Sequence, residues 1–233
     1  YFEVDIKKGE SIIFSAGISE ISPRRLKQTF DAEVADRTPR DSFYHCLKNS
    51  AHQFHNKQEE DHYILAGYPW FKCRARDMFV ALPGLTLAVD ETDEFEDVME
   101  TARKAIGNYI KGEPIGCKIY EMDDPDVLLW AVWALQQYAK ETSREQCRAK
   151  YGSLLEEIID FIRQRKHDNL FLHENGLLYA NGADRAITWM NSTVNGRPVI
   201  PRTGYIVEIN ALWYNALRFI ADLVREGGNG LLA

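Results

Sequence analysis

The sequence lacks the features that mark nucleic-acid-binding, membrane-spanning and metal-binding proteins. Its 233 residues carry a formal net charge of -7 and no long basic tract, which argues against nucleic acid and membrane surfaces as partners. No apolar run approaches the roughly 20 residues of a membrane span. The four cysteines lie far apart without a CxxC spacing, so neither a zinc site nor a disulfide scaffold is indicated, and no cofactor is expected. This cysteine usage favours a reducing, cytoplasmic location.

Common catalytic signatures are also missing. The chain has no P-loop, no dinucleotide-binding glycine motif, no HExxH and no Ser-His-Asp order. The six histidines are scattered, and His45, His52 and His55 are interpreted as ordinary surface or core residues. Nothing in these patterns indicates nucleotide-dependent or metalloprotease chemistry.

The first 41 residues are expected to lie outside the main domain. Alternating apolar residues around a Lys8-Gly9 turn predict a short β-hairpin over residues 1–22, the remnant of a preceding β domain. A linker helix is predicted over residues 23–41, with Ser22 as N-cap and Pro23 in the first turn. The chain begins without Met and ends on a glycine-rich stretch, so we expect a piece of a longer protein.

Residues 42–233 are predicted to be mainly helical. The segment 124–140 is apolar on nearly all sides, which is typical of an inner helix that other helices cover. The amphipathic segment 143–166 follows it and is suited to this covering role. Inner and outer helices that alternate, with conspicuous loops between them, favour a helical toroid over a four-helix bundle.

The stretch 186–217 combines aromatic and polar side chains in a long loop that leads into a helix. Long loops are uncommon in compact domains unless they serve a site or are disordered. Aromatic rings beside amides, an arginine and a carboxylate can hold a sugar, because rings take its C–H face and polar groups take its hydroxyls. The alternative is a well-packed loop over a helical core.

Two further loops carry charged residues. Arg76 and Asp77 stand at the mouth of an apolar helix, where guanidinium and carboxylate together could bind vicinal sugar hydroxyls. The alternative is an N-capping Asp beside an Arg in a salt bridge. The loop 119–126 brings acidic groups to the start of the inner helix, and for Asp123 and Asp124 we prefer helix capping and favourable interaction with the helix dipole.

Taken together, these loops resemble a known family. The segments are AGYPWF (66–71), Arg-Asp before MFVALPGLTLA (76–88), DVLLWAVWALQQY (126–138), and TWM (188–190) followed by GRPVIPRTGYIVEINALWYNAL (196–217). They resemble the C-terminal, amylo-α-1,6-glucosidase domain of glycogen debranching enzymes over about residues 44–225. The resemblance implies a glucoamylase-like (α/α)6 toroid of the six-hairpin type, of which about half is present. It also implies inverting, metal-free hydrolysis of α-1,6-linked glucose on glycogen or a related α-glucan.

The resemblance assigns roles to individual residues. Arg76 and Asp77 match the pair that grips the terminal glucose, and Asp126 matches an acidic position that faces the pocket. The wall and support positions of the sugar pocket are matched by Trp70, Trp189, Arg202 and Glu208. Asn191 stands where the family has the Asp that acts as general acid. Lys72, Arg74 and Ala75 also depart from the family pattern.

The Asn191 departure bears directly on catalysis. Inverting hydrolysis needs one carboxyl group to protonate the leaving oxygen and a second to activate water, about 6.5–9.5 Å apart. An amide can hold a hydroxyl but cannot act as the acid. Asp77, Asp184 and Glu208 are alternative proton donors, and the general base is expected beyond Ala233, so the fragment is expected to be inactive alone.

Two other functions stay open. One is a non-catalytic glucan-binding relative of the same fold, and the other is a helical protein-interaction module. If half a toroid is present, an apolar surface is expected at the open side, either exposed or covered in a homodimer.

Overall fold

The computed structural model describes residues 3–17, 20–67 and 70–226. Three parts of the sequence predictions lie outside the described residues: residues 1, 2, 18 and 19 of the hairpin, Tyr68 and Pro69 of the 66–71 motif, and the glycine-rich end from residue 227. The chain divides into two compact units, Tyr1–Ser50 and Ala51–Ala233.

The first unit contains the turn of the predicted hairpin but not its strands. Gly9 takes a φ of 90°, and the backbone N–H of Glu10 donates to the Lys7 carbonyl at 3.0 Å. Residues 3–17 form no strand, however, so the hairpin prediction is corrected to a turn. The physical reason is exposure: Phe14 is 70% exposed, and a two-stranded hairpin without a packed apolar face is marginal.

A helix follows as predicted, although none of its side chains is buried. The 3-10 helix η1 (Pro23–Arg25) leads into α1 (Leu26–Asp36), and neither contains a buried residue. The next helix, α2 (Phe43–His52), crosses the boundary between the units in sequence.

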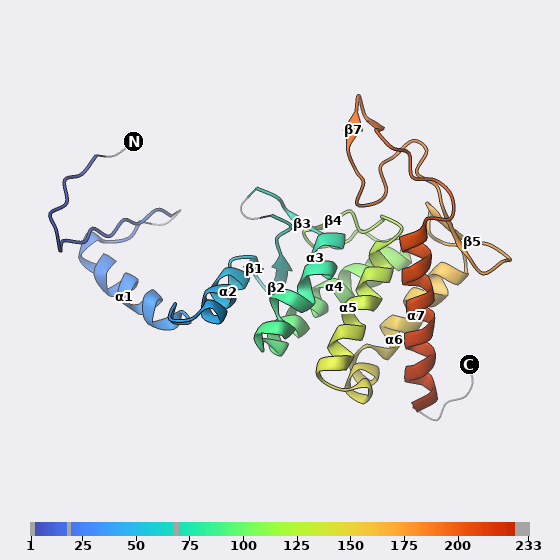
Figure 1. The fold of residues 1–233 in the computed structure, drawn as a ribbon, viewed down its shortest axis with the longest axis horizontal. Helices are drawn as coiled ribbons and strands as arrows, with labels where there is room; N and C mark the ends of the chain where they lie inside the picture. Colours follow the sequence, from blue (N-terminus) through green and yellow to red (C-terminus); the bar gives the residue numbers. More distant parts are fainter. Residues whose placement is uncertain (1–2, 18–19, 68–69, 227–233) are drawn as a thin grey trace. The chain divides into compact units, whose positions relative to one another are not determined.

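Five helices form the framework of the second unit: α3 (Ala75–Leu85), α4 (Thr92–Lys111), α5 (Val127–Glu141), α6 (Arg144–Arg163) and α7 (Val207–Glu226). A short 3-10 helix, η2 (Leu87–Val89), follows α3. Helix α5 packs against α3, α6 and α7, and α4 packs against α6 (Figure 1). The prediction of a mainly helical chain with an inner helix near 124–140 is therefore confirmed.

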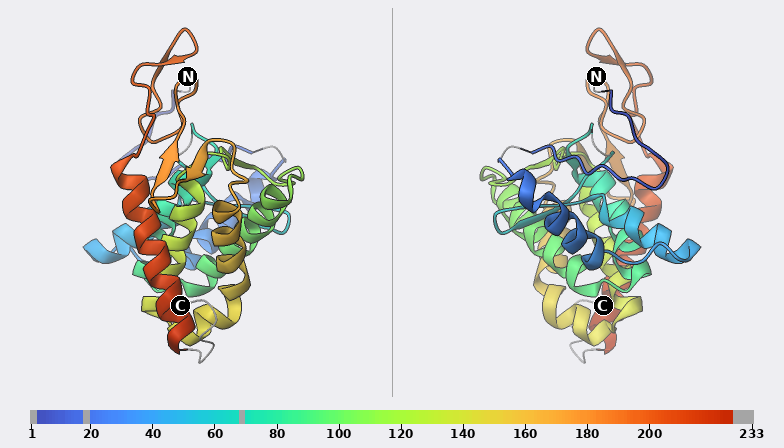
Figure 2. Two further views of the ribbon diagram at one scale, coloured as in Figure 1. Left: turned by 90° about the vertical axis from the view of Figure 1, so that its right-hand side faces the viewer. Right: turned by 90° about the vertical axis from the view of Figure 1, so that its left-hand side faces the viewer.

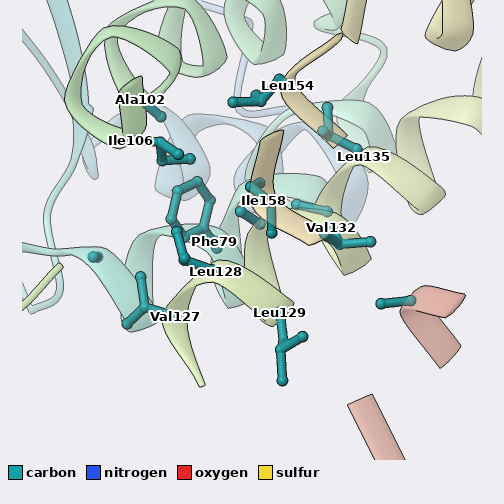
Figure 3. Close-up of a cluster of buried hydrophobic side chains, with 14 of the residues drawn as sticks. Phe79, Ala102, Ile106, Val127, Leu128, Leu129, Val132, Leu135, Leu154 and Ile158 are labelled. Carbon is teal, nitrogen blue, oxygen red and sulfur yellow. The ribbon is translucent and has the colours of Figure 1, made fainter. Parts of the chain in front are cut away.

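The apolar pattern of α5 explains its central place. Nine of its residues are buried, and their side chains meet others from α3, α4 and α6, with Phe79, Ile106, Leu135 and Ile158 among those drawn in Figure 3. The helix begins at Val127, later than predicted, and Asp126 occupies the N-cap position without a side-chain capping bond. At the start of α6, the Ser143 hydroxyl accepts a bond from the Gln146 N–H at 3.1 Å.

The strands in the described part of the chain form four short pairs. They are β1 (His55–Gln58) with β2 (Asp61–Ile64), β3 (Cys73–Arg74) with β4 (Ile119–Tyr120), β5 (Leu170–Leu172) with β6 (Leu178–Ala180), and β7 (Thr193–Val194) with β8 (Arg197–Pro198). Only the β3–β4 pair is parallel. The last three pairs lie at the end of the helices where α3, α5 and α7 begin (Figures 1 and 2). That end therefore gathers the loops that the sequence marks as functional.

None of the helices in the described ranges is both long and apolar enough to cross a membrane.

Candidate functional site

An ion-pair network lies where α3 and α5 begin. Arg76, in the first turn of α3, donates from Nε to Asp126 Oδ2 at 2.8 Å and from Nη2 to Asp126 Oδ1 at 2.8 Å. The same Nη2 donates to Asp124 Oδ2 at 2.6 Å and to the Ile187 carbonyl at 3.3 Å. Although burial lowers the pKa of Arg76, the two carboxylates raise it more, so the guanidinium stays charged.

A second arginine extends this network toward solvent. Arg185 Nη2 donates to Asp124 Oδ1 at 2.9 Å, and its Nη1 pairs with Asp123. Burial raises the pKa of Asp124, while the two guanidinium groups oppose that shift. We call Arg76, Asp123, Asp124, Asp126 and Arg185 the Arg76 cluster.

A polar pocket of about 480 Å³ is lined in part by Asp123, Asp124 and Arg185 of the Arg76 cluster. Its walls come from the end of β3, the acidic loop before α5, and the loop 185–196. The lining residues are Arg74, Glu121, Asp123, Asp124, Arg185, Ala186, Asn191, Thr193 and Gly196. The volume falls within the range of small-ligand sites, and the wall offers both donors and acceptors.

Three of the predicted site residues meet in a second group, which we call the Trp189 cluster. The Trp189 indole N–H donates to Glu208 Oε1 at 3.1 Å, and Arg202 forms an ion pair with the same oxygen. Trp189 is 62% exposed, so its ring faces remain accessible. Beside it lies a cavity of about 270 Å³, lined by Trp189, Met190, Asn191, Ser192, Val199 and Ile200. Asn191 lines both cavities and so connects the two.

Close backbone contacts hold the loop that carries these residues. Ala180 and Gly204 exchange two backbone hydrogen bonds, at 3.0 and 2.9 Å, with Gly204 at a φ of 118°. A Cβ added to Gly182 would lie 2.4 Å from the Arg202 carbonyl oxygen, so only glycine fits there. The Asn210 side chain bonds the N–H and C=O of Leu178, which ties α7 to β6. These contacts hold the backbone on either side of the segment that carries Arg202 and Glu208.

The structure brings together some of the predicted residues and separates others. Trp189, Arg202 and Glu208 form one cluster, and Asn191 borders it. Arg76 and Asp126 pair with each other and are not among the lining residues of the pocket, so their predicted contact with sugar stays a prediction. Trp70 is 85% exposed, and neither it nor the exposed Asp77 lines either cavity.

Several residues of the pocket carry no sequence pattern that marks them as site residues. The sequence favours helix capping for Asp123 and Asp124, but the structure pairs them with Arg185 and Arg76, and Asp126 takes the N-cap position. Arg74, Glu121 and Arg185 were not assigned to the site. The sequence gives one indication for Arg185, which is that it is a single cation in a loop. Such a residue is suited to pair with the acidic loop 119–126.

Comparison with known proteins gives one positive result. The family model described as amylo-alpha-1,6-glucosidase matches residues 47–229, a range that includes every residue of both cavities. Comparisons with curated proteins and with solved structures each give no match.

Proposed function

The chain belongs to the amylo-alpha-1,6-glucosidase family, and from that premise we propose that its polar pocket binds a terminal glucose of an α-glucan such as glycogen. We propose further that the reaction served is inverting hydrolysis of the α-1,6 bond at a branch point. The observation that carries this proposal is the pocket of about 480 Å³ lined in part by the Arg76 cluster, with Asn191 in its wall.

The chemistry of the wall suits a sugar. Each sugar hydroxyl is both a donor and an acceptor, and it is bound best between a cation and a carboxylate. Arg74 and Arg185 supply the cations, and Glu121 and Asp123 supply the carboxylates. The exposed ring of Trp189, next to Asn191, offers a flat apolar surface for the C–H face of a second sugar unit.

The site has no carboxyl group at the position of the family's general acid. Asn191 occupies the position of the family's general acid, and its amide cannot supply a proton. Glu208 accepts bonds from Trp189 and Arg202, so its carboxylate serves as an acceptor in this arrangement. Glu121 also lines the pocket, with Arg74 Nε 3.6 Å from its Oε1, and it is a candidate for an alternative acid because a carboxyl group can carry the proton that the Asn191 amide cannot.

Calorimetry with glucose, maltose and isomaltose tests the binding step. We expect Arg185→Ala to weaken binding at least about tenfold, because it removes a charge-assisted donor worth roughly 1.5–3 kcal/mol. The control is Arg163→Ala, which removes another exposed arginine with an aspartate partner, Asp160, outside the pocket. Equal affinities for Arg185→Ala and the unmodified protein would show that the sugar does not bind in this pocket.

Restoring the acid tests the catalytic step. In the full-length protein, Asn191→Asp should raise hydrolysis of an α-1,6-glucosyl branch by roughly 10²–10⁴, the usual contribution of general acid catalysis. Asn175→Asp, in the exposed turn between β5 and β6, is the control for the charge change. An activated aryl glucoside should show a smaller gain, since its leaving group needs little protonation. If the unmodified enzyme is already fast and Asn191→Asp is neutral, the acid is elsewhere, and Glu121→Gln and Glu208→Gln identify it.

A non-catalytic glucan-binding protein is the second candidate function, and Asn191 itself favours it. This alternative predicts sugar binding that depends on Arg185, together with no hydrolysis in either the unmodified or the Asn191→Asp full-length protein.

A further inference from the structure

Two histidines and two carboxylates face one another on the side of α4 that carries the β1–β2 hairpin. In that hairpin Lys57 pairs with His62, and residues two apart on one strand share a face. His55 therefore lies on the same face as His62, diagonally across the pair. Glu94 and Asp97 are spaced i, i+3 on α4 and so share one side of the helix. The backbone N–H of His62 donates to Thr101 Oγ1 at 2.9 Å, which fixes the hairpin on α4.

The separations between these groups are too long for hydrogen bonds. His55 Nδ1 lies 3.5 Å from Glu94 Oε2, and His62 Nδ1 lies 3.8 Å from the same oxygen and 3.6 Å from Asp97 Oδ2. By contrast, Nδ1 of the exposed His45 lies 2.5 Å from Oδ1 of the exposed Asp41, as in a hydrogen-bonded pair. Two ligands of a tetrahedral zinc ion, each about 2.0–2.1 Å from the metal, stand about 3.3–3.4 Å apart. These three separations are a few tenths of an ångström longer than that spacing.

The tautomer of His55 supplies an independent indication. His55 Nε2 lies 3.2 Å from the carbonyl oxygen of Leu85, which can only accept, so Nε2 carries the hydrogen. In the neutral ring, Nδ1 then has a lone pair that points toward a carboxylate oxygen. Metal-bound histidines characteristically donate their other ring N–H to a backbone carbonyl in this way.

The surroundings leave space for an ion. A cavity of about 180 Å³ adjoins the cluster, and its lining includes His55, His62 and Glu94. His62, Glu94 and Asp97 can each offer one ligand atom, and these three atoms all lie within 4.8 Å of one another. The side chains of His55 and His62 are each 16% exposed, so they are largely shielded while the carboxylates remain open to entry of the ion.

We propose that His55, His62, Glu94 and Asp97 bind one divalent transition-metal ion of the zinc type, which fastens the β1–β2 hairpin to α4. Imidazole with carboxylate ligands suits zinc and its neighbours rather than magnesium or calcium, which prefer all-oxygen sites. The site contains neither a cysteine pair nor an HExxH motif, so the sequence patterns for metal sites gave no sign of it. The site shares no residue with the sugar pocket, so the proposal stands independently of the proposed function.

Calorimetry on EDTA-treated protein with Zn²⁺ tests the site directly. The measurement uses a Cys46→Ser background, because the exposed Cys46 thiol beside His45 is another potential zinc ligand. We expect one Zn²⁺ per chain, visible absorption bands with Co²⁺, and no binding of Mg²⁺. His62→Ala and the conservative Glu94→Gln should each weaken Zn²⁺ binding at least about tenfold, while His45→Ala should leave it unchanged.

Thermal unfolding gives a second readout. Zn²⁺ at 100 times its Kd should raise the Tm by about 5–10 °C, and this gain should be lost in Glu94→Gln. Circular dichroism without metal checks that each variant folds. No Zn²⁺ binding by the unmodified protein would overturn the proposal. So would equal Zn²⁺ affinity in Glu94→Gln and the unmodified protein, and the cluster would then be a set of histidine–carboxylate ion pairs.

Discussion

The Arg76 cluster and the Trp189 cluster each contain an ion pair between an arginine and a carboxylate, but the first pair is buried and the second is partly exposed. In the first, the side chains of Arg76 and Asp126 are 9% and 3% exposed, and in the second those of Arg202 and Glu208 are 18% and 35% exposed. A buried ion pair is costly to break, because removing one partner leaves an uncompensated charge away from water. A half-exposed pair contributes little to stability, but a ligand can reach it. The comparison assigns the buried Arg76–Asp126 pair to architecture. It assigns the more exposed Arg202–Glu208 pair, like the exposed Asp123 and Arg185 of the Arg76 cluster, to ligand contact.

The largest expected effect follows from breaking the buried pair. Asp126→Ala should lower the free energy of unfolding by about 3–5 kcal/mol, because Arg76 loses both of its bonds to Asp126. The measurement is urea denaturation followed by circular dichroism. Asp123→Ala, which removes a half-exposed partner of Arg185, is the control and should cost less than about 1 kcal/mol. Equal losses in the two variants would abolish the distinction between buried and exposed members.

The pH dependence of stability probes the buried side of the same comparison. His167 is 2% exposed and contacts Tyr109 and Phe161, and burial lowers its pKa from 6.5 to about 4. His167 therefore becomes protonated below about pH 6.5 in the unfolded chain but only below about pH 4 in the folded chain. The contribution of His167 to stability is therefore largest above pH 6.5 and falls as the pH drops through this window, by about 2 kcal/mol between pH 7 and 5.

A variant isolates this contribution from that of the carboxylates. His167→Asn should flatten the stability profile between pH 7 and 5, because asparagine does not titrate. The buried Asp124, whose pKa is raised, acts in the opposite direction and is present in both proteins. The same steepness in His167→Asn and the unmodified protein would show that other groups govern the acid response.

A smaller stability effect is expected in the exposed cluster. Glu208→Gln should change the free energy of unfolding by less than about 1 kcal/mol. It should nevertheless weaken isomaltose binding, because Trp189 and Arg202 lose the carboxylate that orients them. Calorimetry and urea denaturation on the same variant separate the two effects, with Glu156→Gln on the exposed side of α6 as the control. A large loss of stability with intact binding would reverse the roles assigned to the two clusters.

The smallest stability effect is expected at Trp70. Its side chain is 85% exposed, so Trp70→Ala should change stability by less than about 0.5 kcal/mol. If Trp70 forms part of the sugar site, as the family resemblance implies, isomaltose affinity should fall all the same. Unchanged affinity in this variant would restrict the site to the pocket and the Trp189 cluster.

Local patterns predicted most of the helical framework. The inner position of α5 follows from a segment with almost no polar side, and the start of α6 follows from Ser143, whose hydroxyl caps the helix. The prediction of a hairpin over residues 1–22 was wrong because an alternating apolar pattern shows only which side chains would share one face of a strand. It does not provide the surface that such a face needs, and Val4, Ile6, Ile12 and Phe14 remain exposed.

Residue chemistry also located the loops of the candidate site, because arginine, carboxylate, amide and tryptophan side chains concentrate in them. Only the tertiary structure decided how these side chains pair. Arg76 binds Asp126, 50 residues away, instead of its neighbour Asp77, and Arg185 joins them from a loop that carries no motif. His62 meets Glu94 because a hairpin is laid on α4. Pairing energies depend on separation and burial in space, and both are set by how the helices pack rather than by the order of residues along the chain.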